Sequence, residues 1–191
     1  MKTGDHEDQR NSSLKGEWYI IEMRKIVQKF GGTSVGDIYK IKKAAEIIAK
    51  EYTQGSAVIA VVSAMSGVTN KLIKLTQEIC DMRSTDALAE HDVVTASGEQ
   101  VTSGLLALAL QSIGFKSRSF AGWQLPIVTD DAYSNGRIMS VGTDAITQVI
   151  KNGEIPVIAG LDARVHVLDG VGDGHTLLFY ETSAFETSVR G

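Results

Sequence analysis

The residues with the clearest capacity for chemistry lie in one short stretch, KFGGTSVG, at positions 29 to 36. A lysine at the end of an apolar run is followed by two glycines, two hydroxyl side chains and a third glycine: Lys29, Gly31, Gly32, Thr33, Ser34 and Gly36. Consecutive backbone N–H groups in a glycine turn that opens a helix form a concave site for anions. The stretch therefore predicts binding of the phosphate groups of a nucleotide.

The same residues also fit a purely structural interpretation. The stretch lacks the Gly-Lys-Ser/Thr ending of the Walker loop, and it does not read G-x-G-x-x-G. A tight turn between a strand and a helix, with Lys29 exposed to solvent, would use similar residue types. Composition alone leaves both interpretations open.

Two further segments carry candidate site residues. The loop SAMSGVTN, at positions 63 to 70, is rich in hydroxyl groups, and it either binds a ligand or only caps the helix that follows. The segment TASGEQ places Glu99 among small and apolar residues. Glu99 lies on a solvated helix face, pairs with a neighbouring cation, or faces the ammonium group of a ligand. Arg137 lies in a polar loop, and by itself it fits a surface residue better than a site residue.

Alternating strands and helices must position these residues. The pattern predicts strands at 25–30, 57–62, 115–120, 127–128 and 155–159, and helices at 37–52, 71–80, 86–112 and 141–151. The apolar runs AVIAVV and IPVIA are typical of strands buried on both faces, so we expect a mainly parallel sheet with helices on both sides. Ligands of such sheets gather at the carboxyl ends of the strands, where both polar loops fall.

Composition restricts the class of protein. The 191 residues are 43% hydrophobic with a formal net charge of −4, which describes a globular domain and disfavours nucleic acid or an anionic membrane as the main partner. The single cysteine, Cys80, is expected to be a packing residue in a reducing compartment. The first 15 or so residues are polar and aperiodic, without the apolar core of a signal peptide, so a cytoplasmic protein is expected. The histidines show no metal-ligand spacing, and we predict no metal site built by the protein alone.

Four motifs in one order carry a resemblance to a family. KFGGTSVGD, VVSAMSGVTNKL, TASGEQ and IPVIAG together resemble the amino-terminal part of the catalytic domain of aspartate kinases, which belong to the amino acid kinase superfamily. The resemblance runs from Met23 to Gly160. It implies a three-layer α/β/α sandwich around a mainly parallel sheet. It also implies ATP-dependent phosphorylation of the side-chain carboxylate of L-aspartate to 4-phospho-L-aspartate, the first step toward lysine, threonine and methionine.

The resemblance implies roles for single residues. ATP would bind at Lys29, Phe30, Gly31, Gly32, Thr33 and Ser34, and L-aspartate at Thr69, Glu99 and Arg137. Lys29 is the candidate catalytic group, and Mg²⁺ would be held mainly through the nucleotide. A carboxylate is already a nucleophile at neutral pH, so no general base is required. The need is for positive charge and oriented N–H groups around the transferring phosphoryl group, and these residues supply both.

The resemblance ends after Gly160. The family's Thr-Leu-Gly-Arg-Gly-Gly-Ser-Asp motif is absent, and the second half of the catalytic domain and the regulatory ACT domains do not follow. We therefore expect a disordered N-terminal extension at residues 1–22, the N-terminal lobe of an amino acid kinase at 23–160, and a divergent or truncated tail at 161–191. Glu181 stands near the position of the motif's aspartate, but no role is transferred to it.

Three hypotheses remain at the level of sequence. The chain is an aspartate kinase truncated at its carboxyl end, with weak or lost activity. Alternatively, it is a non-catalytic nucleotide-binding module, or a subunit that pairs with a full-length kinase. The third hypothesis, a superfamily member acting on glutamate or carbamate, is disfavoured by SAMSGVTN and ASGEQ. A sheet edge left open by missing strands further predicts a homo-oligomer or association through that edge.

Overall fold

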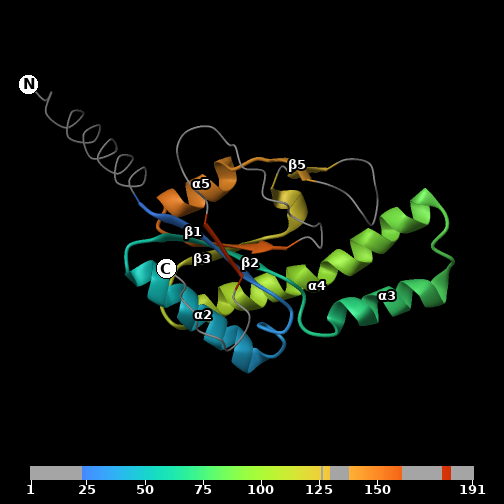
Figure 1. Ribbon diagram of the computed structural model, residues 1–191, viewed down its shortest axis with the longest axis horizontal. Helices are drawn as coiled ribbons and strands as arrows, with labels where there is room; N and C mark the ends of the chain where they lie inside the picture. Colours follow the sequence, from blue (N-terminus) through green and yellow to red (C-terminus); the bar gives the residue numbers. More distant parts are fainter. Residues whose placement is uncertain (1–22, 126, 130–137, 161–177, 182–191) are drawn as a thin grey trace, which may run out of the picture.

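The computed structural model describes residues 23–125, 127–129, 138–160 and 178–181. In chain order, the elements of these residues are β1 (Lys25–Phe30), α2 (Ile38–Thr53), β2 (Ala57–Val62), α3 (Val68–Ile79), α4 (Thr85–Ser112), β3 (Ser117–Phe120), the 3₁₀ helix η1 (Gly122–Gln124), β4 (Ile127–Thr129), β5 (Ile138–Val141), α5 (Asp144–Lys151), β6 (Ile155–Ala159) and β7 (Leu178–Glu181). Figure 1 shows their arrangement.

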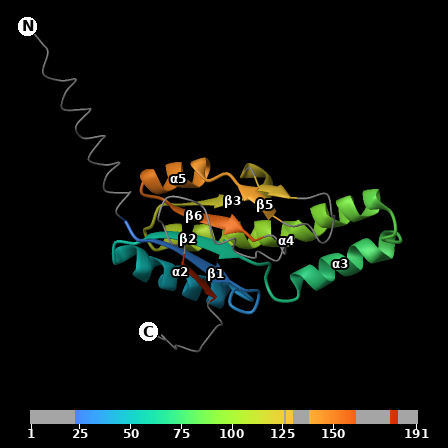
Figure 2. The same cartoon turned by 45° about the horizontal axis from the view of Figure 1, so that its top comes forward.

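Five strands form one parallel sheet in the order β3-β6-β2-β1-β7 (Figure 2). Helices α2 and α4 cover one face of this sheet, and α5 packs on the other face. The predicted three-layer α/β fold with a mainly parallel sheet is therefore confirmed. Because the five strands run in the same direction, their carboxyl ends meet at a single edge of the sheet.

The larger part of the core lies between the sheet and helices α2 and α4. It is built by Phe30, Ile41, Ile48, Leu106 and Leu110, whose side chains are almost completely buried. Burial of each such side chain contributes about 1.5–3 kcal/mol. A smaller cluster under α5 contains Phe120, Leu125, Ile146 and Val149. Successive residues of a strand point to opposite faces of the sheet. The last two residues of β1 therefore face different sides, one covered by α2 and α4 and the other by α5.

Helix α2 begins where the sequence predicts it. The side chain of Asp37, the N-cap residue, accepts a hydrogen bond from the backbone N–H of Lys40 at 2.8 Å. This satisfies one of the donors that the first turn of a helix leaves open. The cap fixes the point at which the loop after β1 turns into the helix, and so it limits the loop to a few residues.

The structure corrects several sequence predictions. The helix predicted from position 141 begins at Asp144, because Val141 instead ends β5 and pairs with Ile127 of the antiparallel strand β4. The strand predicted from position 115 begins at Ser117. Phe115 is still held to the last turn of α4, since its N–H donates to the carbonyl oxygen of Leu110 at 3.1 Å. Cys80 is exposed, so its predicted packing role is wrong.

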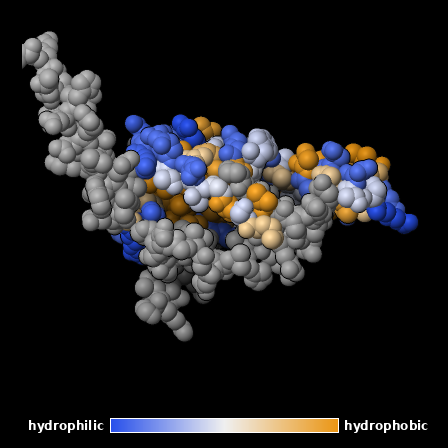
Figure 3. All heavy atoms as spheres, turned by 90° about the horizontal axis from the view of Figure 1, so that it is seen from above, coloured by the Kyte–Doolittle hydropathy of each residue, from blue (hydrophilic) through white to orange (hydrophobic). Residues whose placement is uncertain are grey.

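Helices α3 and α4 form an antiparallel pair that extends beyond the sheet (Figures 1 and 2). The hydroxyl of Thr76 in α3 lies 2.7 Å from Nδ1 of His91 in α4, which links the last turn of α3 to the beginning of α4. Figure 3 shows apolar side chains among polar ones on this projecting end. The exposed apolar residues there are Leu75, Ile79, Val93 and Val94.

Helix α4 has 28 residues and joins the projecting end to the core. In the described part of the chain it is the one helix whose length and composition would also allow it to cross a membrane. Its carboxyl-terminal half packs on β3, β6 and α2, however, and core helices of soluble proteins pass the same test. This packing accounts for its apolar composition.

Candidate functional site

The loop after β1 is a tight turn fixed at both sides. The backbone N–H of Ser34 donates to the carbonyl oxygen of Gly31 at 2.8 Å, and the side chain of Val35 is fully buried in the core under α2 and α4. Nζ of Lys40 donates to the carbonyl oxygen of Thr33 at 3.0 Å. Gly31 and Gly32 are partly exposed, and Thr33 is exposed. The turn therefore presents main chain and a hydroxyl group to solvent while its far end is held in the core.

The loop after β2, residues 63–67, lies directly against this turn. The N–H of Ser63 donates to the carbonyl oxygen of Phe30 at 3.0 Å, which continues the pairing of the two strands. A Cβ placed on Gly32 would lie only 2.8 Å from the carbonyl oxygen of Ala64. A Cβ placed on Gly36 would lie 3.3 Å from Cβ of Ser66. Glycine at these positions lets the two loops approach more closely than residues with side chains would permit.

Helix α3 begins without a side-chain cap. Its N-cap residue is Gly67, with φ at 77°, and no side chain hydrogen-bonds to the first turn. The interpretation that the hydroxyl groups of SAMSGVTN serve only to cap this helix is therefore wrong. Thr69 lies in the first turn of α3 and is half-buried. The amino end of the helix, with the partial positive charge that helices carry there, is directed to the same edge of the sheet.

Glu99 is a buried carboxylate in the middle of α4. It is 6% exposed, and its Oε1 accepts a hydrogen bond from the backbone N–H of Ala64 at 3.2 Å. The interpretation of Glu99 as part of a solvated helix face is thus wrong. A buried carboxylate is costly unless it is hydrogen-bonded or paired, so its position requires a specific reason. The contact with Ala64 places this acidic group beside the loop that also touches Gly32.

The two residues that end β1 lie on opposite faces of the sheet. Phe30 is 1% exposed and belongs to the core under α2 and α4, so its side chain is not available to a nucleotide. Lys29 is exposed and lies on the other face together with Val27, whose partner on β2, Ile59, packs against the cluster under α5. The cation of the predicted site therefore stands on the α5 side of the sheet edge, whereas Glu99 comes from the α4 side.

The predicted residues are thus only partly brought together. Gly32 and Glu99 both meet Ala64, and Thr69 adjoins this contact through its neighbour Val68, whose Cγ1 would be 3.2 Å from a Cβ on Gly98. Arg137 lies outside the described residues. Among those residues, no group of three or more His, Cys, Asp and Glu side chains is placed to hold a metal ion.

Sequence reasoning missed three residues that shape the site. Lys40 braces the first loop, Ala64 joins both loops to Glu99, and Gly98 allows α4 to reach Ala64. The residue type of Lys40 does not predict the contact of its side chain with Thr33. Ala64 and Gly98 carry no signal either, because their contacts connect elements distant in the chain.

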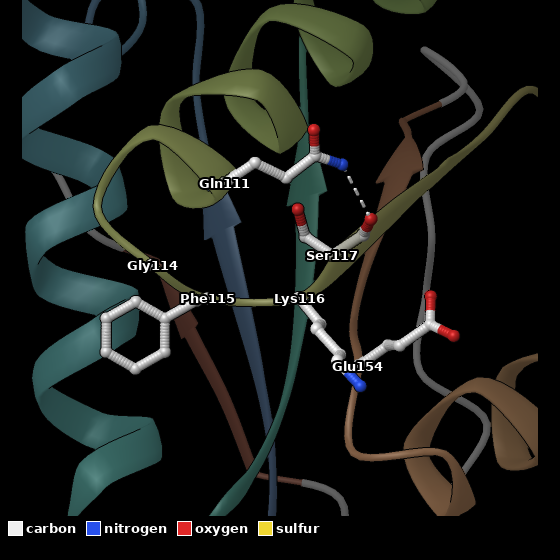
Figure 4. A pocket seen from close by; sticks show the side chains of 6 residues that line it. All are labelled: Gln111, Gly114, Phe115, Lys116, Ser117 and Glu154. Carbon is white, nitrogen blue, oxygen red and sulfur yellow. Dashed lines mark hydrogen bonds between the residues drawn. The ribbon is translucent and has the colours of Figure 1, made fainter.

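One open pocket lies at the opposite edge of the sheet. It has a volume of about 540 Å³ and lies where β3 and β6 begin (Figure 4). Its lining residues are Gln111, Gly114, Phe115, Lys116, Ser117 and Glu154. Nε2 of Gln111 donates to the carbonyl oxygen of Ser117 at 3.1 Å, and Oγ of Ser117 donates to that of Ala107 at 2.8 Å. These polar groups serve to join α4 to β3, and the pocket is remote from the loops described above.

Comparison with known proteins gives a consistent family signal. The model of the amino acid kinase family matches residues 24–181. A curated aspartokinase of Rickettsia bellii is 49% identical over 138 residues, which are 72% of this chain and 34% of that protein. Aspartokinase 2 of Bacillus subtilis is 42% identical over 138 residues, 72% of this chain and 33% of that protein. The chain thus spans about a third of the length of these relatives.

Solved structures show the same fold. The crystal structure of aspartate kinase from Synechocystis aligns with a TM-score of 0.58 and 36% identity, covering 71% of this chain and 21% of that one. Giardia carbamate kinase aligns with a TM-score of 0.55 at 13% identity, covering 74% of this chain and 59% of that one. The second likeness concerns the fold alone.

Proposed function

The chain belongs to the amino acid kinase family, and from this premise we propose that it is the amino-terminal part of an aspartate kinase, which binds ATP and L-aspartate at the carboxyl edge of its sheet. The proposed reaction transfers the γ-phosphoryl group of ATP to the side-chain carboxylate of L-aspartate. Its product, 4-phospho-L-aspartate, would lead toward lysine, threonine and methionine in the cytoplasm.

One observation carries the proposal. The glycine turn after β1 and the loop after β2 contact each other at Gly32 and Ala64, and Ala64 also binds the buried carboxylate of Glu99. A turn suited to phosphate thus lies beside an acidic group suited to an ammonium ion. A related structure supports the assignment, since E. coli aspartokinase III, 19% identical, has been solved in complex with aspartate and ADP.

The reaction needs little covalent help from the protein. A carboxylate oxygen of L-aspartate attacks the γ-phosphorus, and the bond from that phosphorus to the bridging oxygen of ADP breaks. Both reactants are negative, so the barrier comes largely from bringing them together. We assign the charge of Lys29 and the amides of Gly31 and Gly32 to the phosphates. We assign Glu99 to the ammonium group of the amino acid, with Thr69 and Arg137 as further contacts.

Mg²⁺ would enter with the nucleotide. The ion neutralises the phosphate oxygens, and it usually retains water molecules and takes only one or two protein ligands. The exposed hydroxyl of Thr33 is a ligand of the type that this ion accepts, whereas Ser34, the other predicted hydroxyl residue, is buried. The site therefore fits an ion carried by ATP.

The assignment of Lys29 can be tested with a matched lysine on the same strand. Lys29→Ala should weaken binding of ADP with Mg²⁺ roughly tenfold, as expected for loss of one charged hydrogen-bonding group. Lys25 lies on the same face of β1 at its other end, on the order of 13 Å away by the rise of a strand. Lys25→Ala should bind as the native chain does. Equal affinity of the two variants in isothermal titration calorimetry would contradict the role of Lys29.

A second assay distinguishes an enzyme from a binding module. The chain is incubated with ATP, Mg²⁺, L-aspartate and hydroxylamine, which traps an acyl phosphate as a coloured hydroxamate. Product that is lost in Lys29→Ala would support catalysis by this chain. Nucleotide binding without product would support the non-catalytic module or subunit, a hypothesis motivated by the missing Arg-Gly-Gly-Ser-Asp motif.

A further inference from the structure

Three atoms of Ala64 make close contacts with two different elements of the candidate site. Its N–H donates to Oε1 of Glu99 at 3.2 Å. Its carbonyl oxygen would be 2.8 Å from a Cβ on Gly32, and its own Cβ would be 2.9 Å from a Cβ on Gly98. Ala64 is 3% exposed, so solvent does not separate these groups. Ala64, in the loop after β2, therefore connects α4 with the glycine turn after β1 (residues 31–36, called the phosphate turn below).

Gly98 is needed for this arrangement for steric reasons. It is buried in α4, and its backbone is helical, so no unusual φ requires glycine there. Glycine within a helix is unfavourable relative to alanine. What it provides is space, because a methyl group would meet Cβ of Ala64 at 2.9 Å and Cγ1 of Val68 at 3.2 Å. The close approach of α4 brings the next residue, Glu99, within hydrogen-bond distance of the Ala64 amide.

We propose that Gly98 is a positioning residue: by letting α4 lie against Ala64, it fixes the carboxylate of Glu99 on the Ala64 amide and holds it in register with the turn at Gly32. The inference rests on the proposed function, in which Glu99 receives the ammonium group of the amino acid substrate. Gly98 does not touch either substrate. It acts through the orientation of Glu99, and it should therefore affect the amino acid site more than the nucleotide site.

The test compares two glycines of the same helix. A Cβ on Gly104 would find nothing within 4 Å, so Gly104→Ala is the matched control for Gly98→Ala. Both variants gain the same helix propensity. In the full 191-residue chain, Gly98→Ala should weaken binding of L-aspartate roughly tenfold while affinity for ADP with Mg²⁺ is retained. In ¹H–¹⁵N spectra, the Ala64 amide signal should shift in Gly98→Ala and stay in place in Gly104→Ala.

A compensating change separates positioning from general damage. Ala64→Gly removes the methyl group that a side chain at position 98 would meet. The double variant Gly98→Ala/Ala64→Gly should recover part of the L-aspartate affinity and the native amide position of residue 64, although Val68 still limits the space. Recovery would also keep the inference testable if Gly98→Ala alone fails to fold.

The outcomes are distinguishable. If Gly98→Ala matches Gly104→Ala in both the amide spectrum and L-aspartate affinity, the positioning role is overturned. The same holds if affinities for L-aspartate and ADP fall together and the double variant recovers neither. If the native chain binds no L-aspartate, the proposed function of Glu99 fails. The steric part of the inference is then still decided by the Ala64 amide signal. A shift of this signal in Gly98→Ala but not in Gly104→Ala supports it, and identical signals in the two variants overturn it.

Discussion

Replacing Gly32 with alanine should destabilise the protein by an amount that the contact with Ala64 sets. The added Cβ would lie 2.8 Å from the carbonyl oxygen of Ala64, whereas ordinary contacts begin at 3.4 Å. The two loops must therefore separate by roughly half an ångström, and overpacking of this kind costs about 1–3 kcal/mol. Gly31→Ala is the matched comparison for stability, because a Cβ there would have nothing within 4 Å.

The comparison removes the effect of alanine on the unfolded chain. Either substitution reduces the entropy of that state, which favours folding by about 0.4–1 kcal/mol. Neither glycine has a positive φ, so neither backbone is strained by alanine. Gly31→Ala should therefore be slightly more stable than the native chain, and Gly32→Ala about 1–3 kcal/mol less stable than Gly31→Ala.

Urea unfolding followed by circular dichroism measures this difference, provided that both variants share one m-value. A midpoint for Gly32→Ala at or above that of Gly31→Ala would refute the close approach of the two loops. It would also remove the structural basis for coupling the phosphate turn to Glu99.

Three further predictions concern the scaffold. Leu110→Ala should lower the free energy of unfolding in urea by about 2–5 kcal/mol, because this side chain is fully buried in the core. Leu108→Ala, on the exposed side of α4, should change it by less than about 0.5 kcal/mol. Equal effects of the two substitutions would contradict the packing of α4. Asp37→Ala should lower the stability by about 1 kcal/mol, because the cap on the Lys40 amide is lost, whereas Asp37→Asn should keep most of the stabilisation that the cap provides. A thermal melt in which the Asn variant is as unstable as the Ala variant would argue against the cap. Within the described strands, β3 and β7 lie at the two edges of the sheet, so the chain should associate as its concentration rises. Light scattering that reports a monomer at every concentration would count against this.

The sequence predicts the framework of the fold well because its signals are local. The run AVIAVV gives β2 with its observed bounds, and Asp37 marks the start of α2 through a cap that depends on neighbours three positions away. Strand β5 was missed for the opposite reason. Val141 continues an apolar pattern of helical spacing, and only its pairing with Ile127 shows that it belongs to a strand.

The candidate site was predictable in its residue types but not in its arrangement. The composition of KFGGTSVG suggests an anion site, and the resemblance to aspartate kinases draws attention to Glu99. The burial of Glu99, however, depends on Ala64 and Gly98, which are 34 positions apart and have no chemistry of their own. Strand periodicity alone separates Lys29 and Phe30 onto opposite faces of the sheet, but which helices cover each face depends on the packing of α2, α4 and α5.

The place of β7 in the sheet has a consequence for synthesis of the protein. Strand β1 pairs with β2 on one side and with β7 on the other, and Val27 meets Phe179 about 150 positions later in the chain. At a translation rate of about 5–20 residues per second, that side of β1 stays without its partner for roughly 8 to 30 seconds on the ribosome. During this interval, a nascent chain exposes main-chain donors and acceptors next to the phosphate turn, where another extended segment could pair with them.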